Sequence, residues 1–236
     1  MSPIVKKIKT ELKKTGDKKI AAHSLKFFKT KKGEYGEGDK FLGIRVPVLR
    51  KIAKTYQDIA INDISELIKS KWHEQRLLSV LMMINAFKKG DQNIKKAIYE
   101  LYLENTEFIN NWDIVDISAS NIAGAYLENK DKKPIYDLAL SKNLWERRIS
   151  IISTHHFIKN NDFKNALNIS DILIKDKEDL IHKAVGWTLR EVGKRSLKTE
   201  EEFVKNRYKN MPRTMLRYAI ERFEENKRKK YLKGEI

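Results

Sequence analysis

Apolar residues recur three and four positions apart along almost the whole chain, which is the spacing of amphipathic helices. The predicted helices cover residues 48–56, 63–70, 73–87, 94–104, 111–127, 133–140, 144–158, 162–174, 178–194, 200–208 and 213–223. A stripe of Ile4, Val5, Ile8 and Leu12 predicts one more helix near the start. No segment alternates apolar and polar residues as a half-buried strand does. The sequence therefore predicts an all-α protein.

Short polar breaks separate these helices and indicate how they are arranged. The breaks fall at Gly90-Asp91, 129–132, 141–143, Asn160-Asn161, Asp176 and Met211-Pro212. Helices joined by short loops pack as antiparallel neighbours. Four tryptophans, Trp72, Trp112, Trp145 and Trp187, are separated by 40, 33 and 42 residues, which is near the period of HEAT and armadillo repeats. We expect a single domain over residues 1–236, a solenoid (α-α superhelix) of HEAT-like antiparallel helix pairs.

Two segments depart from the helical pattern. Residues 29–40 contain three glycines and, besides Tyr35, no apolar residue. They lack the spacing of a phosphate-binding loop, and no strand precedes them. The segment is either a flexible connection or a basic loop whose exposed tyrosine touches nucleic acid. Residues 227–233 are rich in lysine and arginine, and we expect a frayed basic C-terminus there.

The charge balance favours a polyanionic partner. Lys and Arg exceed Asp and Glu by 49 to 32, and the net charge is +17. Part of this excess is explained by coding bias, because 37 Lys against 12 Arg, with many Ile and Asn, is typical of AT-rich DNA. The arginines are then the more informative cations, since a planar forked donor is not interchangeable with an ammonium group.

The absence of cysteine excludes disulfides, thiolate zinc sites and a cysteine nucleophile. The first residues contain no apolar run long enough for a signal peptide or a membrane span. We therefore expect a soluble, cytoplasmic protein.

An acidic window interrupts the basic chain. Residues 97–129 contain no lysine or arginine, and they carry Glu100, Glu104, Glu107, Asp113, Asp116 and Glu128. Carboxylates repel the DNA backbone, so a surface that only binds phosphates has no use for them. They are useful where a cation is recognised or where positive charge develops during a reaction.

Asp116 is the candidate for chemistry within this window. It follows Trp112 by four residues, which places both side chains on one face of a helix. A carboxylate beside an indole face suits a cation. The alternative is a first-turn acid bonded to neighbouring backbone, and the sequence does not separate the two. For Asp113 we expect a structural role, in a first turn capped by Asn111.

The remaining polar residues give weaker indications. Arg147, Arg148 and Arg190 could hold phosphates through bidentate bonds, or could be ion-pair partners between repeats. His155 and His156 are adjacent and cannot chelate one metal together. His23, His73 and His182 lack a carboxylate or histidine at ligand spacing. We therefore expect no metal and no cofactor.

Several segments, taken together, resemble the AlkD family of DNA alkylation repair glycosylases. They are FLGIRVPVLRK at 41–51, WDIVD at 112–116, NLWERR at 143–148 and KAVGWTLRE at 183–191. The likeness runs over residues 20–222 in order and spacing, and the family's fold is a solenoid of HEAT-like repeats. The glycine-rich segment at 29–40 and residues 211–220 depart from the family pattern.

The resemblance implies hydrolysis of the N-glycosidic bond of cationic alkylated purines, such as 7-methylguanine and 3-methyladenine, in duplex DNA. Carried over by motif, Asp116 corresponds to the catalytic carboxylate, and Trp112 and Trp187 correspond to the aromatic pair on the lesion's deoxyribose. Arg148 corresponds to the arginine that holds the nearby DNA backbone. Trp72 and Trp145 are interpreted as packing residues at equivalent positions of the repeats.

The sequence thus predicts a monomeric DNA-alkylpurine glycosylase that acts on double-stranded DNA in base excision repair and does not bind membranes. The alternative is a non-catalytic HEAT-repeat protein that recognises damaged or branched DNA. A scaffold for an acidic protein or for RNA is a third possibility.

Overall fold

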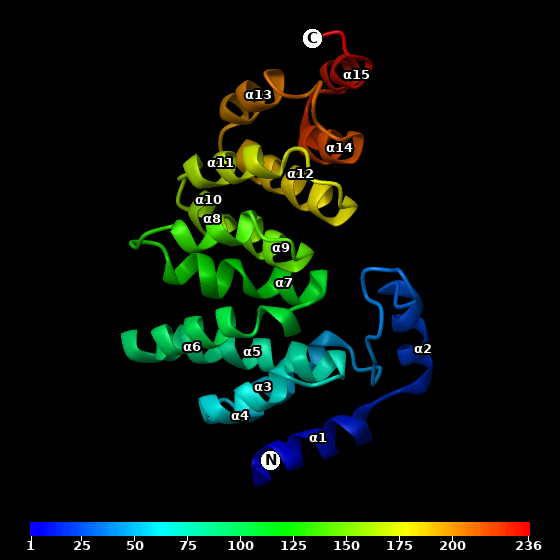
Figure 1. The fold of residues 1–236 in the computed structure, drawn as a ribbon, viewed down its shortest axis with the longest axis vertical. Coiled ribbons are helices and arrows are strands. Elements are labelled where there is room, and N and C mark those ends of the chain that lie inside the picture. Colours follow the sequence, from blue (N-terminus) through cyan, green and yellow to red (C-terminus); the bar gives the residue numbers. More distant parts are fainter. The chain divides into compact units, whose positions relative to one another are not determined.

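The structure is a computed structural model that describes residues 1–236. It is helical throughout and contains no strand, only one isolated bridge between Lys40 and Trp72 (Figure 1). The predicted all-α class is confirmed. The chain packs as two compact units, residues 1–118 and 119–236, which are described separately below. The expected single domain stays a prediction.

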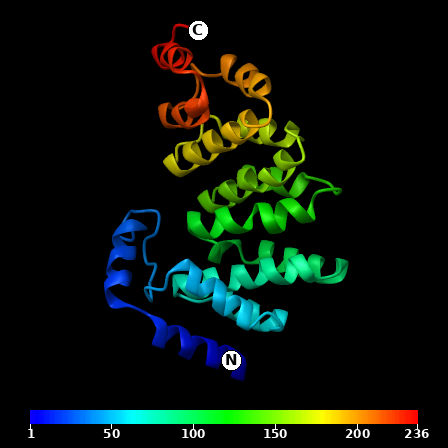
Figure 2. The same cartoon turned by 180° about the vertical axis from the view of Figure 1, so that it is seen from behind.

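Unit 1 is built around one long buried helix, α5. Its helices are α1 (Pro3–Thr15), α2 (Lys18–Phe27), α3 (Val46–Thr55), α4 (Ile61–Ile68), α5 (His73–Lys89), α6 (Gln92–Glu104) and α7 (Trp112–Ser118), with a 3-10 turn at Thr106–Phe108. Helix α5 packs against α3, α4, α6 and α7, and Figure 2 shows α3 to α6 side by side. Most of its residues are buried, including the four polar residues of its first turn, His73, Glu74, Gln75 and Arg76.

Unit 2 is organised in the same way around α12. It contains a π-helical turn at Ser120–Gly124, α8 (Lys133–Ala139), α9 (Leu144–Ser153), α10 (His155–Lys159), α11 (Lys164–Leu173), α12 (Asp179–Gly193), α13 (Leu197–Lys205), α14 (Arg213–Ala219), a 3-10 turn at Ile220–Arg222 and α15 (Glu225–Lys233). Helix α12 packs against α9, α11, α13 and α14. Helices α12 and α14 approach closely at Gly186, where a β carbon would lie 2.5 Å from the Met215 carbonyl oxygen of α14.

Two of the predicted helices are interrupted. The helix expected at 111–127 ends as α7 at Ser118, and the helix expected at 144–158 breaks at Thr154. At both places hydroxyl groups bond to carbonyls of the preceding turn: the Ser118 Oγ donates to the Ile114 carbonyl, and the Thr154 Oγ1 donates to that of Ile151. Such bonds compete with the helical pattern and bend helices.

Helix α2 was not predicted, and the end of the chain was predicted wrongly. Helix α2 has no buried residue, so it leaves no clear apolar stripe in the sequence. Residues 227–233, where a frayed end was expected, lie in α15 (Glu225–Lys233). Tyr231 is 1% exposed, and its ring meets those of Tyr208 and Phe223 at 5.3 and 5.7 Å. One buried aromatic residue thus anchors an otherwise basic helix.

A set of side-chain bonds recurs in the two units with an offset of 71 residues. Arg76 donates to the Ser70 carbonyl and Arg147 donates to the Ser141 carbonyl, both at 3.0 Å. Ser79 donates to the Ile64 carbonyl, as its counterpart Ser150 does to that of Ile135. This offset spans two of the periods expected from the tryptophans.

The same offset shows that Trp72 and Trp145 do not occupy equivalent positions. The counterpart of Trp72 is Asn143, and the counterpart of Trp145 is Glu74. The interpretation of the two tryptophans as equivalent packing residues is therefore wrong in register. Trp145 is buried at 7% exposure, whereas Trp72 is partly exposed.

Glu74 holds the segment that leads into α3. It is 3% exposed, and its carboxylate accepts the backbone N–H groups of Leu42, Gly43 and Ile44 at 2.8, 2.7 and 3.2 Å. Gly43 has a φ of 81°, and a β carbon there would lie 2.0 Å from the Asp17 carbonyl oxygen. The glycine of the FLGIRVP segment is therefore required by the backbone, and the Glu74 carboxylate fixes it in place.

We expect Glu74→Ala to lower the free energy of unfolding by about 3 kcal/mol or more, because three buried N–H groups would lose a charged acceptor. Urea unfolding followed by circular dichroism measures the change. The matched control is Glu100→Ala, which removes an exposed acid of the same unit and is expected to change stability by less than about 0.5 kcal/mol. Equal effects of the two changes would contradict the proposed role of Glu74.

Candidate functional site

Helix α7 carries the predicted site residues of unit 1. Asn111, fully buried, accepts the Trp112 N–H on its Oδ1 at 2.8 Å and so sets the start of the helix. Trp112 and Asp116 are both partly exposed, while Ile114 and Val115 between them are buried. The helix therefore presents Trp112 and Asp116 toward its accessible side, as their spacing of four predicts.

An aromatic cluster surrounds the Trp112 ring. Phe27 and Phe28, at the end of α2, lie with ring centroids 5.8 and 5.4 Å from it. The Trp112 Nε1–H donates to the Tyr35 hydroxyl at 3.3 Å. Phe27 stays 55% exposed, so the cluster continues to the surface.

The contact with Trp112 changes the interpretation of residues 29–40. The segment is folded by turns, with Gly33 and Gly38 at φ values of 80° and 82°. Tyr35 is partly buried and is not the fully exposed side chain that the nucleic-acid alternative assumed. The segment packs on the tryptophan of the candidate site, and its function in the structure is to hold that ring.

Asp116 lies close to a buried tyrosine. The hydroxyl of Tyr102 is 2.9 Å from the Ser118 Oγ. Burial is the main cause that raises the pKa of Tyr102 above its usual value, and the negative charge of Asp116 adds to it. Tyr102 therefore stays protonated beside the carboxylate.

Asp113 has a structural role, as expected, but through a partner that the sequence did not reveal. Its Oδ2 lies 2.8 Å from the Nε2 of His73, and its Oδ1 accepts the Ile114 N–H. The other ring nitrogen of His73, Nδ1, lies 3.2 Å from Asp39. Asp39 also accepts a bond from Arg76. One buried imidazole thus joins the end of the glycine-rich segment, the start of α5 and the start of α7.

Two aromatic rings cover the His73 side chain. Phe28 and Phe41 have their centroids 5.0 and 4.6 Å from the imidazole, and His73 is 2% exposed. Burial lowers the pKa of His73, but the charge of Asp113 and the bonds to Asp113 and Asp39 outweigh it and raise the pKa to about 9. The pKa of Asp39 is lowered, because its bond to His73 and the charge of Arg76 outweigh its burial. Near neutral pH, the His73 side chain is therefore an imidazolium that lies between the carboxylates of Asp39 and Asp113.

In unit 2, Arg148 lies inside the packing between α9 and α12. The residue is 5% exposed, and its guanidinium donates to the Leu180 carbonyl at 2.5 Å. This bond joins α9 to the first turn of α12. The predicted contact between Arg148 and DNA stays a prediction, and it would require the guanidinium to turn toward solvent.

Trp187 is partly exposed on α12 and is held from two sides. Its Nε1–H donates to Glu191 at 2.8 Å, and its ring meets the His155 imidazole edge to face at 4.6 Å. The His155 Nε2 lies 2.9 Å from the Thr188 hydroxyl. Burial lowers the pKa of His155 to about 4, so the imidazole that supports Trp187 is neutral.

Two other arginines near the tryptophans are ion-pair partners. Arg147 pairs with Asp176 at 2.6 Å, and Arg190 pairs with Glu221. These pairs favour the alternative in which both arginines are ion-pair partners within the protein, and not the one in which they hold phosphates. The predicted site residues are thus divided between the units, with Trp112 and Asp116 in unit 1 and Arg148 and Trp187 in unit 2.

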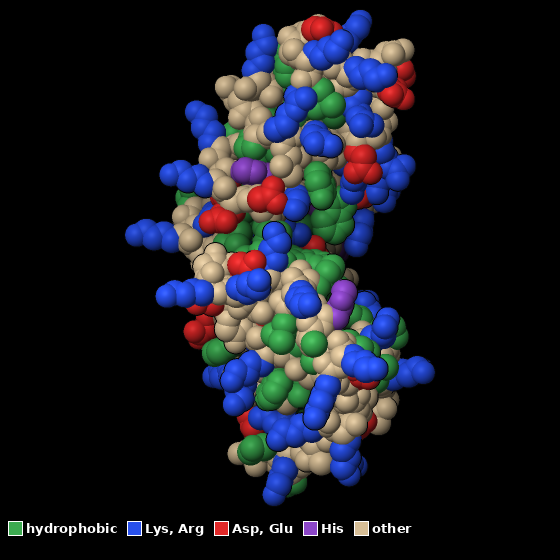
Figure 3. Space-filling model, turned by 90° about the vertical axis from the view of Figure 1, so that its right-hand side faces the viewer, with side chains coloured by type: hydrophobic (Ala, Val, Ile, Leu, Met, Phe, Trp, Pro, Cys, Tyr) green, Lys and Arg blue, Asp and Glu red, His purple; other side chains and the backbone are tan.

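Basic side chains are abundant on the surface of the protein. Figure 3 shows lysine and arginine side chains over much of one face of the molecule, in keeping with the net charge of +17. No helix of the structure is long and apolar enough to cross a lipid bilayer.

Fold and site define a helical, basic protein that presents a carboxylate and an indole from one helix. The sequence profile of the DNA alkylation repair enzymes matches residues 8–223, which is most of the chain. The protein belongs to this family, which gives it a role in the repair of alkylated DNA.

A solved structure shares the fold. It is described as a predicted DNA alkylation repair enzyme from Enterococcus faecalis, with a TM-score of 0.68, 15% sequence identity, and coverage of 89% of this chain and 98% of that one. Among curated proteins, no sequence matches this one significantly.

Proposed function

We propose that the protein is a DNA glycosylase that hydrolyses the N-glycosidic bond of cationic alkylated purines in duplex DNA. The observation that carries this proposal is the pair on α7, in which Asp116 follows Trp112 by one helical turn and both side chains reach the surface. A protein that only bound the DNA backbone would gain nothing from a carboxylate there.

The chemistry needs no general acid, because a base alkylated at N7 or N3 already carries a positive charge. Cleavage leaves both electrons of the glycosidic bond on the base, which departs neutral, and the deoxyribose becomes an oxocarbenium-like cation. A carboxylate about 4 Å away stabilises that cation by on the order of 4 kcal/mol at an effective dielectric near 20. Water then adds to the sugar carbon, and Asp116 accepts or directs the proton that the water loses.

Trp112 contributes through its ring face. An indole beside the sugar attracts positive charge through its quadrupole, and this attraction grows as the charge develops. The Tyr35 hydroxyl and the rings of Phe27 and Phe28 restrict how the indole can move. In this mechanism the glycine-rich segment acts by holding the ring in place. Trp187 and Arg148 are assigned to the deoxyribose and the DNA backbone by the motif resemblance alone.

A second candidate is a DNA-binding protein that recognises lesions without excising them. The burial of Arg148 and its bond to the Leu180 carbonyl favour this reading, because a buried arginine is not in place to hold a phosphate. Both candidates predict binding to duplex DNA, and only the first predicts release of a free base.

The deciding measurement is incubation with a duplex that carries one 7-methylguanine, followed by chromatography of the released base. We expect release that exceeds spontaneous depurination and scales with protein concentration. Undamaged duplex of the same sequence is the control. Tight binding of the lesion duplex without release of 7-methylguanine would leave the non-catalytic candidate standing and remove the glycosylase.

A further inference from the structure

The indole of Trp187 is bonded to a carboxylate of its own helix. Its Nε1–H donates to the Glu191 Oε1 at 2.8 Å, and the two residues are four positions apart on α12. Side chains at this spacing lie on one face of a helix, so the bond needs no distortion of the backbone. Both residues are partly exposed, which places the bond at the surface of unit 2 and not in its core.

Glu191 is a charged acceptor. The oxygen that takes the indole N–H also takes a bond from Lys194 at 2.5 Å. Burial raises the pKa of Glu191, but the bonds from Lys194 and Trp187 outweigh it and lower the pKa below its ordinary value. Glu191 is therefore a carboxylate near neutral pH, and an ionised acceptor makes a stronger hydrogen bond than a neutral one does.

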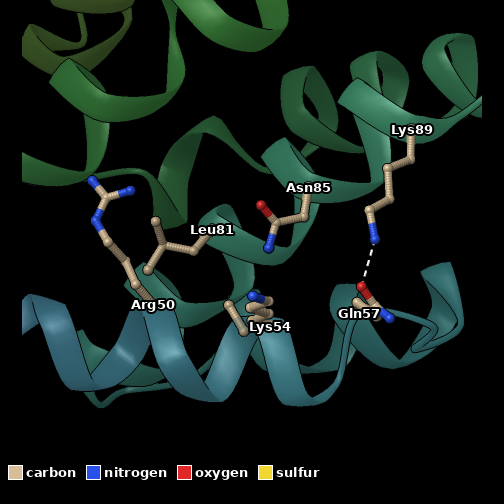
Figure 4. A pocket seen from close by; sticks show the side chains of 7 residues that line it. Arg50, Lys54, Gln57, Leu81, Asn85 and Lys89 are labelled. Atoms are coloured by element: carbon tan, nitrogen blue, oxygen red, sulfur yellow. Dashed lines mark hydrogen bonds between the residues drawn. The ribbon is translucent and has the colours of Figure 1, made fainter.

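A short lysine bond does not by itself mark a site in this protein. In unit 1, Lys89 of α5 donates to the uncharged Gln57 at the same 2.5 Å, as Figure 4 shows. What separates Glu191 from such a surface contact is the indole N–H. A ring whose edge is fixed by a bond presents its face in one direction, and the face is the part of an indole that attracts a cation.

A second support meets the Trp187 ring from another direction. The His155 imidazole lies edge to face against it, with centroids 4.6 Å apart and an angle of 88° between the ring planes. His155 is 8% exposed, and its Nε2 lies 2.9 Å from the Thr188 Oγ1, so the imidazole is itself held in place. The indole cannot turn about its χ2 bond without breaking its contact with His155 or its bond to Glu191.

The two candidate tryptophans are held in different ways. Trp112 packs against the rings of Phe27 and Phe28, and its N–H donates to the neutral Tyr35 hydroxyl at 3.3 Å. Trp187 makes a shorter bond, and it makes this bond to a charged group. The orientation of Trp112 is thus set mainly by packing, whereas that of Trp187 depends more on its hydrogen bond.

We propose that Glu191 is a positioning residue, which fixes the indole of Trp187 so that one ring face meets the deoxyribose of the lesion. This role rests on the proposed function, in which Trp187 lies beside that sugar. The face of an indole is negative and its edge is positive, so only the face stabilises a developing cation. An indole that turned freely would present its edge for part of the time and would stabilise the sugar cation less.

The test compares two changes at one position. Glu191→Leu removes the acceptor, and Glu191→Gln keeps an oxygen for the indole N–H while it removes the charge. Glu202→Leu is the matched control, because Glu202 is an exposed acid of unit 2 that pairs with a lysine of its own helix, Lys198, at 4.0 Å. Single-turnover kinetics on a 7-methylguanine duplex measure the excision step, and fluorescence anisotropy measures affinity for an undamaged duplex.

We expect Glu191→Leu to excise about tenfold to a hundredfold more slowly and to bind the undamaged duplex within about twofold of the parent. Glu191→Gln should excise within about fivefold of the parental rate, since its neutral oxygen makes the weaker bond. Glu202→Leu should match the parent. Equal losses in the two Glu191 variants would mean that the charge acts and the bond does not, which overturns the proposal. A joint loss of rate and duplex affinity in Glu191→Leu overturns it as well.

The bond itself is measured from the indole N–H signals in a ¹H–¹⁵N spectrum. The chain has four tryptophans, and the signal of Trp187 is the one that Trp187→Phe removes. We expect this signal to move upfield and to exchange faster with solvent in Glu191→Leu, and to keep its parental position in Glu202→Leu. A Trp187 signal that does not respond to loss of the acceptor would show that the bond does not form in solution, and the positioning role would fall.

Two duplexes that cannot be cleaved separate this role from the proposed function. One carries a pyrrolidine analogue of the abasic sugar, which is cationic at neutral pH, and the other carries the neutral tetrahydrofuran analogue. The parent should bind the cationic duplex more tightly, and Glu191→Leu should lose about tenfold of that preference. A parent that releases no base would remove the glycosylase and leave this comparison intact. An equal preference in parent and Glu191→Leu would overturn the positioning role even where the parent releases base.

Discussion

Asp116→Asn is expected to slow base release by about three orders of magnitude and to leave affinity for the lesion duplex within about twofold of the parent. The change keeps the size of the side chain and removes its charge. A loss of about 4 kcal/mol of transition-state stabilisation corresponds to a roughly 10³-fold slower excision step, at 1.36 kcal/mol per factor of ten. Single-turnover kinetics on a 7-methylguanine duplex measure the step, and anisotropy measures the affinity.

Asp58→Asn is the matched control, since it makes the same change at an exposed acid of the same unit. It should excise at the parental rate. An Asp116→Asn variant with full activity would remove this carboxylate from the mechanism. A variant that loses activity and duplex affinity together would assign Asp116 to binding instead.

His73→Gln is the second change for which we expect a large effect. Two partly buried carboxylates, those of Asp39 and Asp113, would lose the cation between them, and Arg76 alone would remain to balance their charge. Breaking a buried charge pair by removing one partner costs about 3–5 kcal/mol. Guanidinium unfolding at pH 6.5 should show a loss of this size, and excision should slow because the start of α7 is no longer anchored.

The stabilisation that His73 gives to the folded protein should depend on pH, and its pKa determines the direction of that dependence. The folded pKa of about 9 lies above the ordinary value of 6.5, so the folded state binds the proton more tightly than the unfolded state does. This contribution is complete below about pH 6.5 and is lost as the pH rises through 9. It amounts to about 3 kcal/mol at most, at 1.36 kcal/mol for each pKa unit.

The parent and the Gln variant should therefore approach each other in stability between pH 6.5 and 10. Arg76 and Asn111 also face the pair. His23→Gln makes the same substitution at an exposed ring of α2 and should leave the pH profile unchanged. A constant difference between parent and His73→Gln over the whole range would show that His73 is neutral in the folded protein.

Several helices could be placed from the sequence because their apolar residues face one neighbouring layer. Helices α3 to α6 begin and end within two residues of the predicted positions. The helices that were not predicted, or were predicted too long, have local causes. Helix α2 buries no side chain, so its pattern is weak, and the hydroxyls of Ser118 and Thr154 break two helices whose apolar spacing continues past them.

The candidate site was predictable where one helix carries it. The four-residue spacing of Trp112 and Asp116 needs only the geometry of α7. The partners of Trp112 were not predictable, because Tyr35 precedes it by 77 residues and no pattern links the two positions.

The sequence by itself determined the helical class, the basic charge and the face of α7 that carries Trp112 and Asp116, because these follow from composition and from spacing within single helices. Only the tertiary structure decided that His73 lies between Asp39 and Asp113, which are 34 and 40 residues away. It also decided that Arg148 lies buried against the Leu180 carbonyl. Pairings of this kind depend on how separate helices pack, and a sequence pattern records the face of each helix but not the neighbour that it meets.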